Sequence, residues 1–317
     1  MNTPKLAKDG ARALVLPGTC LVLALLIKPV QDRVEAWLGQ QSIVTDQLYF
    51  GSPLAVKKIA LGYECLLADV YWMRTIQYYG RREEAAKRPV RYKNLGTLLD
   101  ITTTLDPDLL DAYRAGSSFL AEADPIGAGQ PLEAIRLLDK GISRHPLEWR
   151  LWFDKGFVYF WFLKDFKSAG EAWLAASRLS TAPAWMEGLA AMGLSRSGAV
   201  ETAKTLWQHQ YQESTRADVR ENARNHLLSI QVAEDQWTLE FFLNKYREHA
   251  GNFPQRLDDL VRAGFLRYIP QDPLGTPYQY DPKEGKVRLG FQTRVRRLEV
   301  PEAYRQAYLE RLARRYQ

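Results

Sequence analysis

Histidine and cysteine side chains are the usual metal ligands and catalytic nucleophiles, and this chain of 317 residues contains only four histidines and two cysteines. The histidines are His145, His209, His226 and His249. None has a second histidine four residues away, and no CxxC pair, HExxH helix or GxSxG turn occurs. These are the arrangements that zinc sites and serine hydrolases need. We therefore predict no metal site, no cofactor and no enzyme activity.

The sequence also contains no recognisable phosphate-binding motif. The one glycine pair of interest, Gly127-x-Gly129, is not followed by Gly-Lys-Ser/Thr and does not follow a predicted strand. We expect no small-molecule substrate. An enzyme of the cell envelope with an unrecognised active site remains an alternative.

The positive charge of the chain is concentrated near its C-terminus. The formal net charge is +6, and residues 286–317 alone hold nine Lys or Arg and three Glu. A final helix is predicted to begin near Val300-Pro301-Glu302 and to carry the basic tail Arg305, Arg311, Arg314 and Arg315. Such a helix is either a solvated cap or a contact for anionic lipid headgroups or an acidic partner. We expect no nucleic acid partner, because the chain is expected to be exported.

An apolar run near the N-terminus predicts that export. Lys5, Lys8 and Arg12 precede an uncharged stretch from Ala13 to Ile27, which spans roughly 22 Å as a helix against a hydrocarbon core of roughly 30 Å. An uncleaved signal anchor (1–30), a cleaved signal peptide and a buried core helix all remain open. The preceding positive charges place the N-terminus inside. We predict a single-pass protein of the bacterial inner membrane with its C-terminal part in the periplasm.

Helical periodicity dominates the middle of the chain. After a connector (31–60), apolar residues recur at spacings of three and four from residue 61 onward. The helical patterns end at Asp106-Pro107, His145-Pro146 and Thr181-Ala182-Pro183, so the closing prolines are 39 and 37 residues apart. A period in the thirties is typical of stacked helix-turn-helix repeats.

The residues within these units resemble the tetratricopeptide repeat (TPR) family. Trp152, Gly156 and Tyr159 match the first helix of its pattern, and Ala134, Leu138, Gly141 and Pro146 match the second helix. The resemblance covers roughly residues 60–230, and it implies a TPR-like α-solenoid over 61–232. The small residues let two helices approach closely while the large ones fill the space between them.

The same resemblance assigns a partner-binding groove. The family pattern directs Arg150, Phe153, Phe157 and Phe160 into the concave face of the repeats. Three aromatic rings and one arginine suit an apolar or extended peptide. The alternative is that another segment of this chain fills the groove, which would make the protein purely structural.

A different pattern follows in residues 233–291. Trp237–Ala250 predicts an amphipathic helix and Arg256–Ala263 a shorter one, and two short strands are expected around Lys283-Glu284-Gly285. The stretch from Pro270 to Tyr280 resembles the C-terminal region of the major pseudopilins of type II secretion. The pilin methylation motif and the acidic calcium loop of that family are missing, so only the local fold is expected.

The expected fold is therefore mainly α, with an N-terminal membrane helix (1–30), helical repeats, a small α+β module (233–291) and a basic C-terminal helix (292–317). The predicted function is a membrane-anchored, exported scaffold that binds other envelope proteins or peptides. The pseudopilin-like module suggests, by analogy, a secretion or type IV pilus assembly.

Overall fold

The computed structural model describes residues 28–30, 32–33, 51–80 and 92–316 of the chain. The chain divides into two compact units, Met1–Tyr49 and Phe50–Gln317. In the first unit the described residues are helical. Nearly all of the predicted membrane helix (1–30), most of the connector (31–60) and the polar break at 81–91 lie outside the described residues. Among the helices that are described, none combines the length and the apolar composition needed to cross a bilayer.

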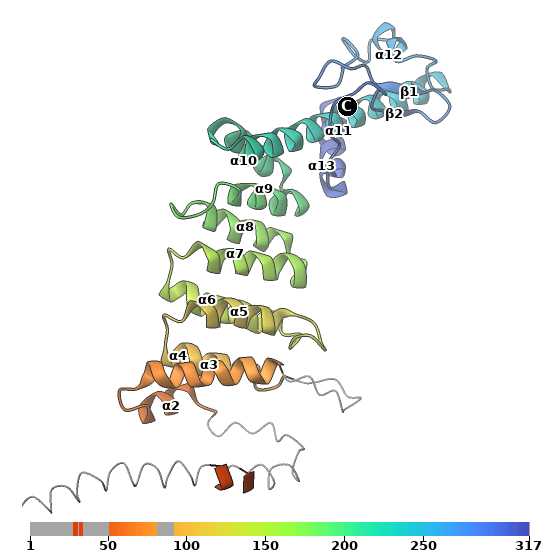
Figure 1. Ribbon diagram of the computed structural model, residues 1–317. Coiled ribbons are helices and arrows are strands. Elements are labelled where there is room, and N and C mark those ends of the chain that lie inside the picture. Colours follow the sequence, from red (N-terminus) through yellow and green to blue (C-terminus); the bar gives the residue numbers. More distant parts are fainter. Residues whose placement is uncertain (1–27, 31, 34–50, 81–91, 317) are drawn as a thin grey trace, which may run out of the picture. The chain divides into compact units, whose positions relative to one another are not determined.

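The second unit is mainly helical, which confirms the expected class (Figure 1). Its first helices are α2 Pro53–Ile59, α3 Glu64–Gly80, α4 Leu95–Leu105, α5 Leu110–Ala121 and α6 Pro131–Arg144. The helices that follow are α7 Trp149–Val158, which continues as the π-helix η1 Tyr159–Leu163, then α8 Phe166–Ser177, α9 Met186–Arg196, α10 Val200–Glu213 and α11 Ala217–Ala250.

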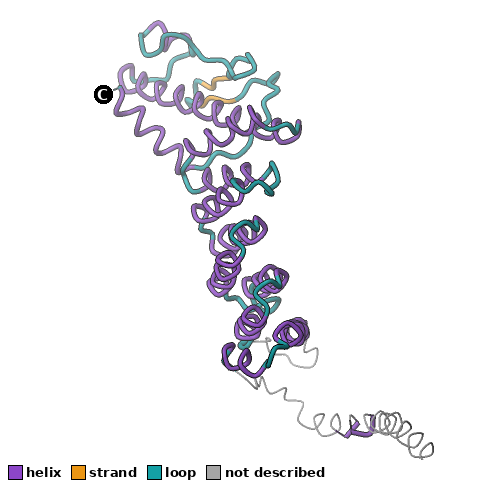
Figure 2. Tube along the Cα trace, turned by 90° about the vertical axis from the view of Figure 1, so that its left-hand side faces the viewer, coloured by secondary structure: helices purple, strands orange, loops and turns teal. Residues whose placement is uncertain are grey.

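Successive helices pack in pairs, namely α3 with α4, α5 with α6, α7 with α8 and α9 with α10. Each pair also contacts the next, so the pairs follow one another in chain order (Figures 1 and 2). Pro107, Pro146 and Pro183 all lie in the loops between pairs. Proline lacks the N–H that a helix interior requires, which explains why it closes each pair.

Close approach of neighbouring helices, within a pair and between pairs, depends on small residues. A Cβ atom at Gly116 of α5 would overlap the side chain of Leu99 on α4, and one at Gly156 of α7 would overlap Trp173 on α8. Leu99 and Trp173 are almost fully buried. The large side chain of one helix therefore occupies the space that a glycine leaves on its neighbour.

The C-terminal part combines one long helix with a hairpin. Helix α11 has 34 residues and ends at Gly251, whose φ of 80° is left-handed. After α12 Asp258–Arg262, strands β1 Gln279–Asp281 and β2 Lys286–Arg288 pair antiparallel, with Tyr280 opposite Val287. Val287 and Leu260 pack on α11 in one apolar cluster with Leu239 and Leu243. The final helix α13, Glu302–Arg315, also packs on α11.

The predicted boundary at residue 232 falls inside α11. The sequence suggests a helix from Trp237, but the structure begins it twenty residues earlier, at Ala217. The reason is that α11 packs on different partners along its length. Its first half contacts α10, where Ala223 and Ile230 of α11 cluster with Trp207, whereas its second half carries the hairpin. One helix therefore joins the paired helices to the C-terminal module.

Candidate partner-binding surface

Four large aromatic residues follow one side of α7 and η1 at a spacing of four. They are Trp149, Phe153, Phe157 and Trp161, which we call the aromatic ladder. Neighbouring ring centroids lie 6.3, 6.4 and 6.2 Å apart along the series. Residues four apart lie above one another on a helix, so each ring packs on the next. The result is a continuous row of aromatic surface.

The π-helix decides which residues complete this row. A π-helix contains more residues per turn than an α-helix, so each residue advances through a smaller angle around the axis. Trp161 therefore stays close to the line of Phe157, while Phe160 turns away toward α8. The segment ends at Lys164, whose φ of 54° is left-handed, and Asp165 then caps α8 by accepting the Ser168 N–H at 3.0 Å. π-segments occur frequently at functional sites.

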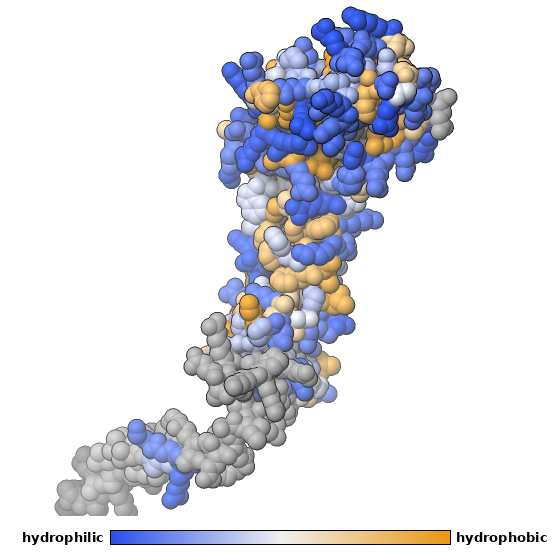
Figure 3. Space-filling model, turned by 90° about the vertical axis from the view of Figure 1, so that its right-hand side faces the viewer, coloured by the Kyte–Doolittle hydropathy of each residue, from blue (hydrophilic) through white to orange (hydrophobic). Residues whose placement is uncertain are grey.

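Exposure increases along the ladder. Its first half packs against Trp185, whose ring lies edge-on to Trp149 at 6.1 Å and to Phe153 at 5.9 Å. Its second half is open, because Phe157 is 39% exposed and Trp161 is 54% exposed. Figure 3 shows hydrophobic residues gathered on one face of the paired helices, next to a mainly hydrophilic C-terminal part. Large exposed aromatic rings in a row are typical of a binding surface.

Charged groups border the ladder. The Arg150 guanidinium lies 5.0 Å from the Trp149 ring, and the Lys164 ammonium lies 5.3 Å from the Trp161 ring. Arg150 also pairs with Glu148 at 3.0 Å. On the same helix, Asp154 pairs with Arg114 of α5 at 2.7 Å. The residues around the ladder thus carry positive and negative charge. They favour a partner that has apolar side chains together with charges of both signs.

The four predicted groove residues do not all lie on one surface of the structure. Arg150 is exposed, and Phe153 and Phe157 lie on the ladder. The prediction for Phe160 is wrong, since its side chain is only 4% exposed and packs between Phe166 and Trp173. The Arg196 guanidinium of α9 covers its other side at 5.0 Å. Phe160 is thus a core residue between α7, α8 and α9.

Three residues of this surface were not predicted. They are the ladder residues Trp149 and Trp161, and Trp185, which packs beside the ladder. The four-residue spacing from Phe153 and Phe157 identifies the first two in the sequence. The family pattern does not include them, because the groove positions it assigns here are residues 150, 153, 157 and 160. Trp185 comes from a separate helix pair, so no spacing rule within α7 reveals it.

The four arginines of the basic tail lie on α13 and each has a partner. Arg305 pairs with Glu302 at 3.4 Å and with Glu240 at 3.7 Å. Arg311 pairs with Glu201 at 3.0 Å, and Arg314 with Glu310 at 3.8 Å. The Arg315 guanidinium lies 5.8 Å from the Tyr316 ring. Intrachain carboxylates thus partly neutralise this charge, which weakens the case for a free anion-binding tail.

Tyr304 fixes α13 in place. It is 2% exposed, its ring packs on Trp237 of α11, and its hydroxyl donates to Glu234 and to Glu201. Burial beside these two carboxylates raises the pKa of Tyr304 above its ordinary value. A buried aromatic and polar contact therefore holds the helix, in addition to the ion pairs of Arg305 and Arg311.

The histidines all have structural contacts. His145 contacts the Pro107 carbonyl oxygen at 2.9 Å, His209 pairs with Glu187 at 2.9 Å, and His226 stacks on Trp207. Burial lowers the pKa of His226 to about 4. His249 contacts the Lys245 carbonyl oxygen. In the part of the chain that the structure describes, no three His, Cys, Asp or Glu residues come together as metal ligands.

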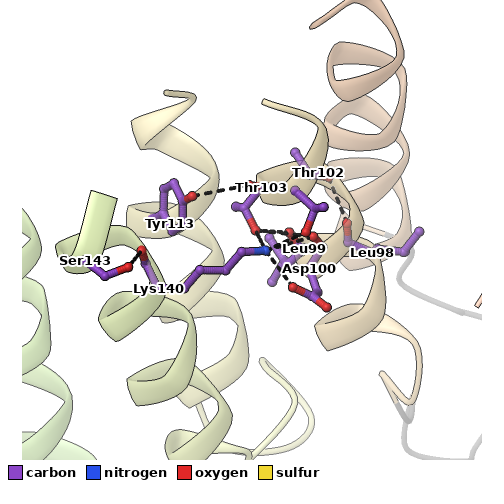
Figure 4. A network of polar contacts seen from close by, with 9 residues as sticks. Leu98, Leu99, Asp100, Thr102, Thr103, Tyr113, Lys140 and Ser143 are labelled. Carbon is purple, nitrogen blue, oxygen red and sulfur yellow. Dashed lines mark hydrogen bonds and ion pairs between the residues drawn. The ribbon is translucent and has the colours of Figure 1, made fainter. Parts of the chain in front are cut away.

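A cleft of about 440 Å³ lies over α4 and α6 and contains Lys93, Asp100 and Lys140. Figure 4 shows the Lys140 side chain extending from α6 toward Asp100 and Thr103 of α4. The Lys140 ammonium contacts Asp100 Oδ1 at 2.6 Å, Thr104 Oγ1 at 2.7 Å and Thr103 Oγ1 at 2.8 Å. These oxygens satisfy all three of its donors. The lysine therefore clamps α6 to α4 and is not positioned to bind a ligand.

Comparison with models of known protein families, with curated proteins and with solved structures finds no match for this chain.

Proposed function

We propose that this protein is an exported, membrane-anchored scaffold of TPR type, whose aromatic ladder binds an apolar segment of another envelope protein. The single observation that carries the proposal is the exposure of Phe157 and Trp161, at 39% and 54%. Ordered aromatic rings lose little side-chain entropy on binding, and they dominate the energy of many protein interfaces.

The packing of the helices supports the solenoid architecture. The glycines that match the small positions of the TPR pattern occur where a large side chain of a neighbouring helix packs against them. A Cβ atom at Gly141, for example, would lie 2.8 Å from the Tyr113 ring. Helix pairs of this kind bury their apolar faces only by stacking on one another. Such an array presents a long surface to a partner.

Binding to a separate protein is favoured over a groove filled by this chain. Within residues 51–80 and 92–316, no segment covers the open half of the ladder. Both of its exposed rings remain accessible while the first half is closed by Trp185. We infer that the ladder accepts one short apolar stretch of a partner, with Arg150 and Lys164 at its two ends.

The predicted location follows from the N-terminal charges and apolar run: a single pass through the bacterial inner membrane with the second unit in the periplasm. The helix and hairpin after residue 233 support the local fold of the pseudopilin-like module. By analogy alone, they associate the protein with an envelope secretion or pilus assembly.

The test is an in-cell crosslinking pull-down of the full chain from membranes. The variant Phe157→Ser/Trp161→Ser removes the open half of the ladder, and Tyr211→Ser serves as control because Tyr211 is a comparable aromatic, 44% exposed, on α10. We expect the ladder variant to lose its crosslinked partner at least tenfold while the control retains it, as loss of two hot-spot residues predicts. Equal recovery from both variants would exclude the ladder as the binding surface.

A further inference from the structure

The turn between α2 and α3 presents apolar side chains to solvent. Leu61 is 82% exposed and Tyr63 is 70% exposed, and Ile59 and Leu66 on either side are 52% and 63% exposed. Leu54 of α2 is also open, at 68%. Isolated exposed apolar residues are common, but a concentration of this kind marks an interaction site.

The backbone of the turn fixes this exposure. The Tyr63 N–H donates to the Ala60 carbonyl oxygen at 2.9 Å, which closes a tight turn. Its two central residues both have left-handed φ values, 49° at Leu61 and 91° at Gly62. Glycine adopts this conformation freely, whereas leucine does so at a cost of roughly 1–2 kcal/mol. A leucine held here points out of the turn with no described neighbour to bury it.

Basic charge lies on the α2 side of the turn, and the first acidic residue, Glu64, follows the turn at the start of α3. Residues 51–63 contain Lys57 and Lys58 and no acidic residue, and both lysines are exposed in the last turn of α2. Leucine inserts among acyl chains, tyrosine prefers the membrane–water interface, and lysine contacts lipid phosphates. The turn therefore has the composition of a lipid contact.

We propose that the α2–α3 turn is a second, peripheral membrane contact, in which Leu61 and Tyr63 enter the interface of an anionic bilayer and Lys57 and Lys58 bind its phosphates. The proposal rests on the membrane attachment proposed above. Two carboxylates of α3 limit the depth of insertion, half-buried Glu64 directly after Tyr63 and exposed Asp69. Asp69 lies six residues beyond Tyr63, roughly 9 Å along the helix axis. Only the turn enters the lipid.

A fluorophore that is sensitive to lipid tests the proposal in the full chain. In a Cys20→Ser/Cys65→Ser background, Leu61→Cys is labelled and the protein is reconstituted into vesicles with anionic lipid and a lipid-borne quencher. Leu147→Cys is the matched control, since Leu147 is 75% exposed and lies in the α6–α7 loop. We expect quenching at position 61 at least threefold stronger than at position 147.

The charge requirement provides a second arm. One test is the variant Lys57→Glu/Lys58→Glu, and the other is the use of vesicles of zwitterionic lipid. In both, we expect the ratio of lipid-inserted to free turn to fall by roughly fivefold for each lysine that no longer binds a phosphate. Equal quenching at both positions would overturn the proposal. Protection of position 61 that depends on protein concentration in detergent, without quenching by lipid, would also overturn it and assign the turn to a second copy of the chain.

Flotation of the same vesicles separates this proposal from the proposed function. A chain that floats with lipid while position 61 stays unquenched is anchored without a contact at the turn, so only the present proposal fails. A chain that does not float has neither attachment, and both proposals fail.

Discussion

Arg114 of α5 and Asp154 of α7 form an ion pair, with Arg114 Nε 2.7 Å from Asp154 Oδ2. The pair joins the first helices of two neighbouring helix pairs. Asp154 is the more enclosed partner, with 16% of its side chain exposed against 36% for Arg114. Burial raises the pKa of Asp154 above its ordinary value, and the nearby guanidinium offsets only part of that effect. The contact therefore specifies how the helices meet, and its net contribution to stability is small.

Arg114→Ala should destabilise the protein, because it leaves a buried carboxylate without a partner. We expect a loss of about 2 kcal/mol in the free energy of unfolding at pH 7. A raised pKa means that the folded state disfavours the ionised carboxyl. The contribution of Asp154 to stability is therefore highest in acid and falls as pH rises. The loss of unfolding free energy caused by Arg114→Ala should accordingly be smaller at pH 4 than at pH 7. Denaturant unfolding at both pH values measures this difference. Asp154→Asn, which keeps an acceptor but no charge, should change stability by less than about 1 kcal/mol; a larger loss than for Arg114→Ala would contradict the argument.

Asp235 should make the C-terminal module less stable as pH rises above 4. Burial raises the pKa of this α11 carboxyl to about 6, while the Tyr278 hydroxyl donates to it at 3.0 Å and opposes the shift. The unfolded carboxyl ionises near pH 4, so stability from Asp235 is complete below that pH and is lost as pH rises through about 6. The group is only partly buried, so we expect Asp235→Asn to add about 1 kcal/mol at pH 7 after solvent screening. The variant should show no gain at pH 4, and an equal gain at both pH values would refute the linkage.

Phe160→Ala should destabilise the protein far more than Trp161→Ala, although the two residues are adjacent. Phe160→Ala empties a site between α7, α8 and α9, and we expect it to cost about 3 kcal/mol of unfolding free energy. Trp161→Ala removes a ring that is 54% exposed, so its cost should stay below about 1 kcal/mol. Thermal and denaturant unfolding of the two variants is a direct comparison. Similar losses would mean that the π-helix does not separate a core side from a ladder side.

The sequence predicts the helix pairs well, because their information is local. Apolar spacing, the three prolines and glycines such as Gly116 and Gly156 locate helices and their closest contacts. The hairpin around Lys283-Glu284-Gly285 is predicted for the same reason, since Gly285 adopts a φ of 66° there. Each of these features depends on a few neighbouring residues.

The features that the sequence misses depend on tertiary contacts. Within the π-helix Phe160 turns into the core, which the regular spacing of the family pattern does not anticipate. The early start of α11 at Ala217 depends on its packing against α10. The pairing of the basic tail is also missed, because a count of charges does not reveal that Glu201 and Glu240, distant in sequence, lie beside Arg311 and Arg305.

Gly156→Ala should be strongly destabilising, although alanine is the better helix former. The added methyl group would overlap the Trp173 ring, whose Nε1 donates to the Phe153 carbonyl oxygen at 3.1 Å. Trp173 is 2% exposed, so the ring has no free space to move into. We expect a loss of roughly 2–3 kcal/mol from overpacking.

Gly96→Ala on α4 is the matched control, because its nearest contact would be Leu120 at 4.0 Å. It should leave stability unchanged or raise it by up to about 1 kcal/mol. If both variants lose stability equally in denaturant unfolding, the loss reflects the backbone and not the contact between α7 and α8.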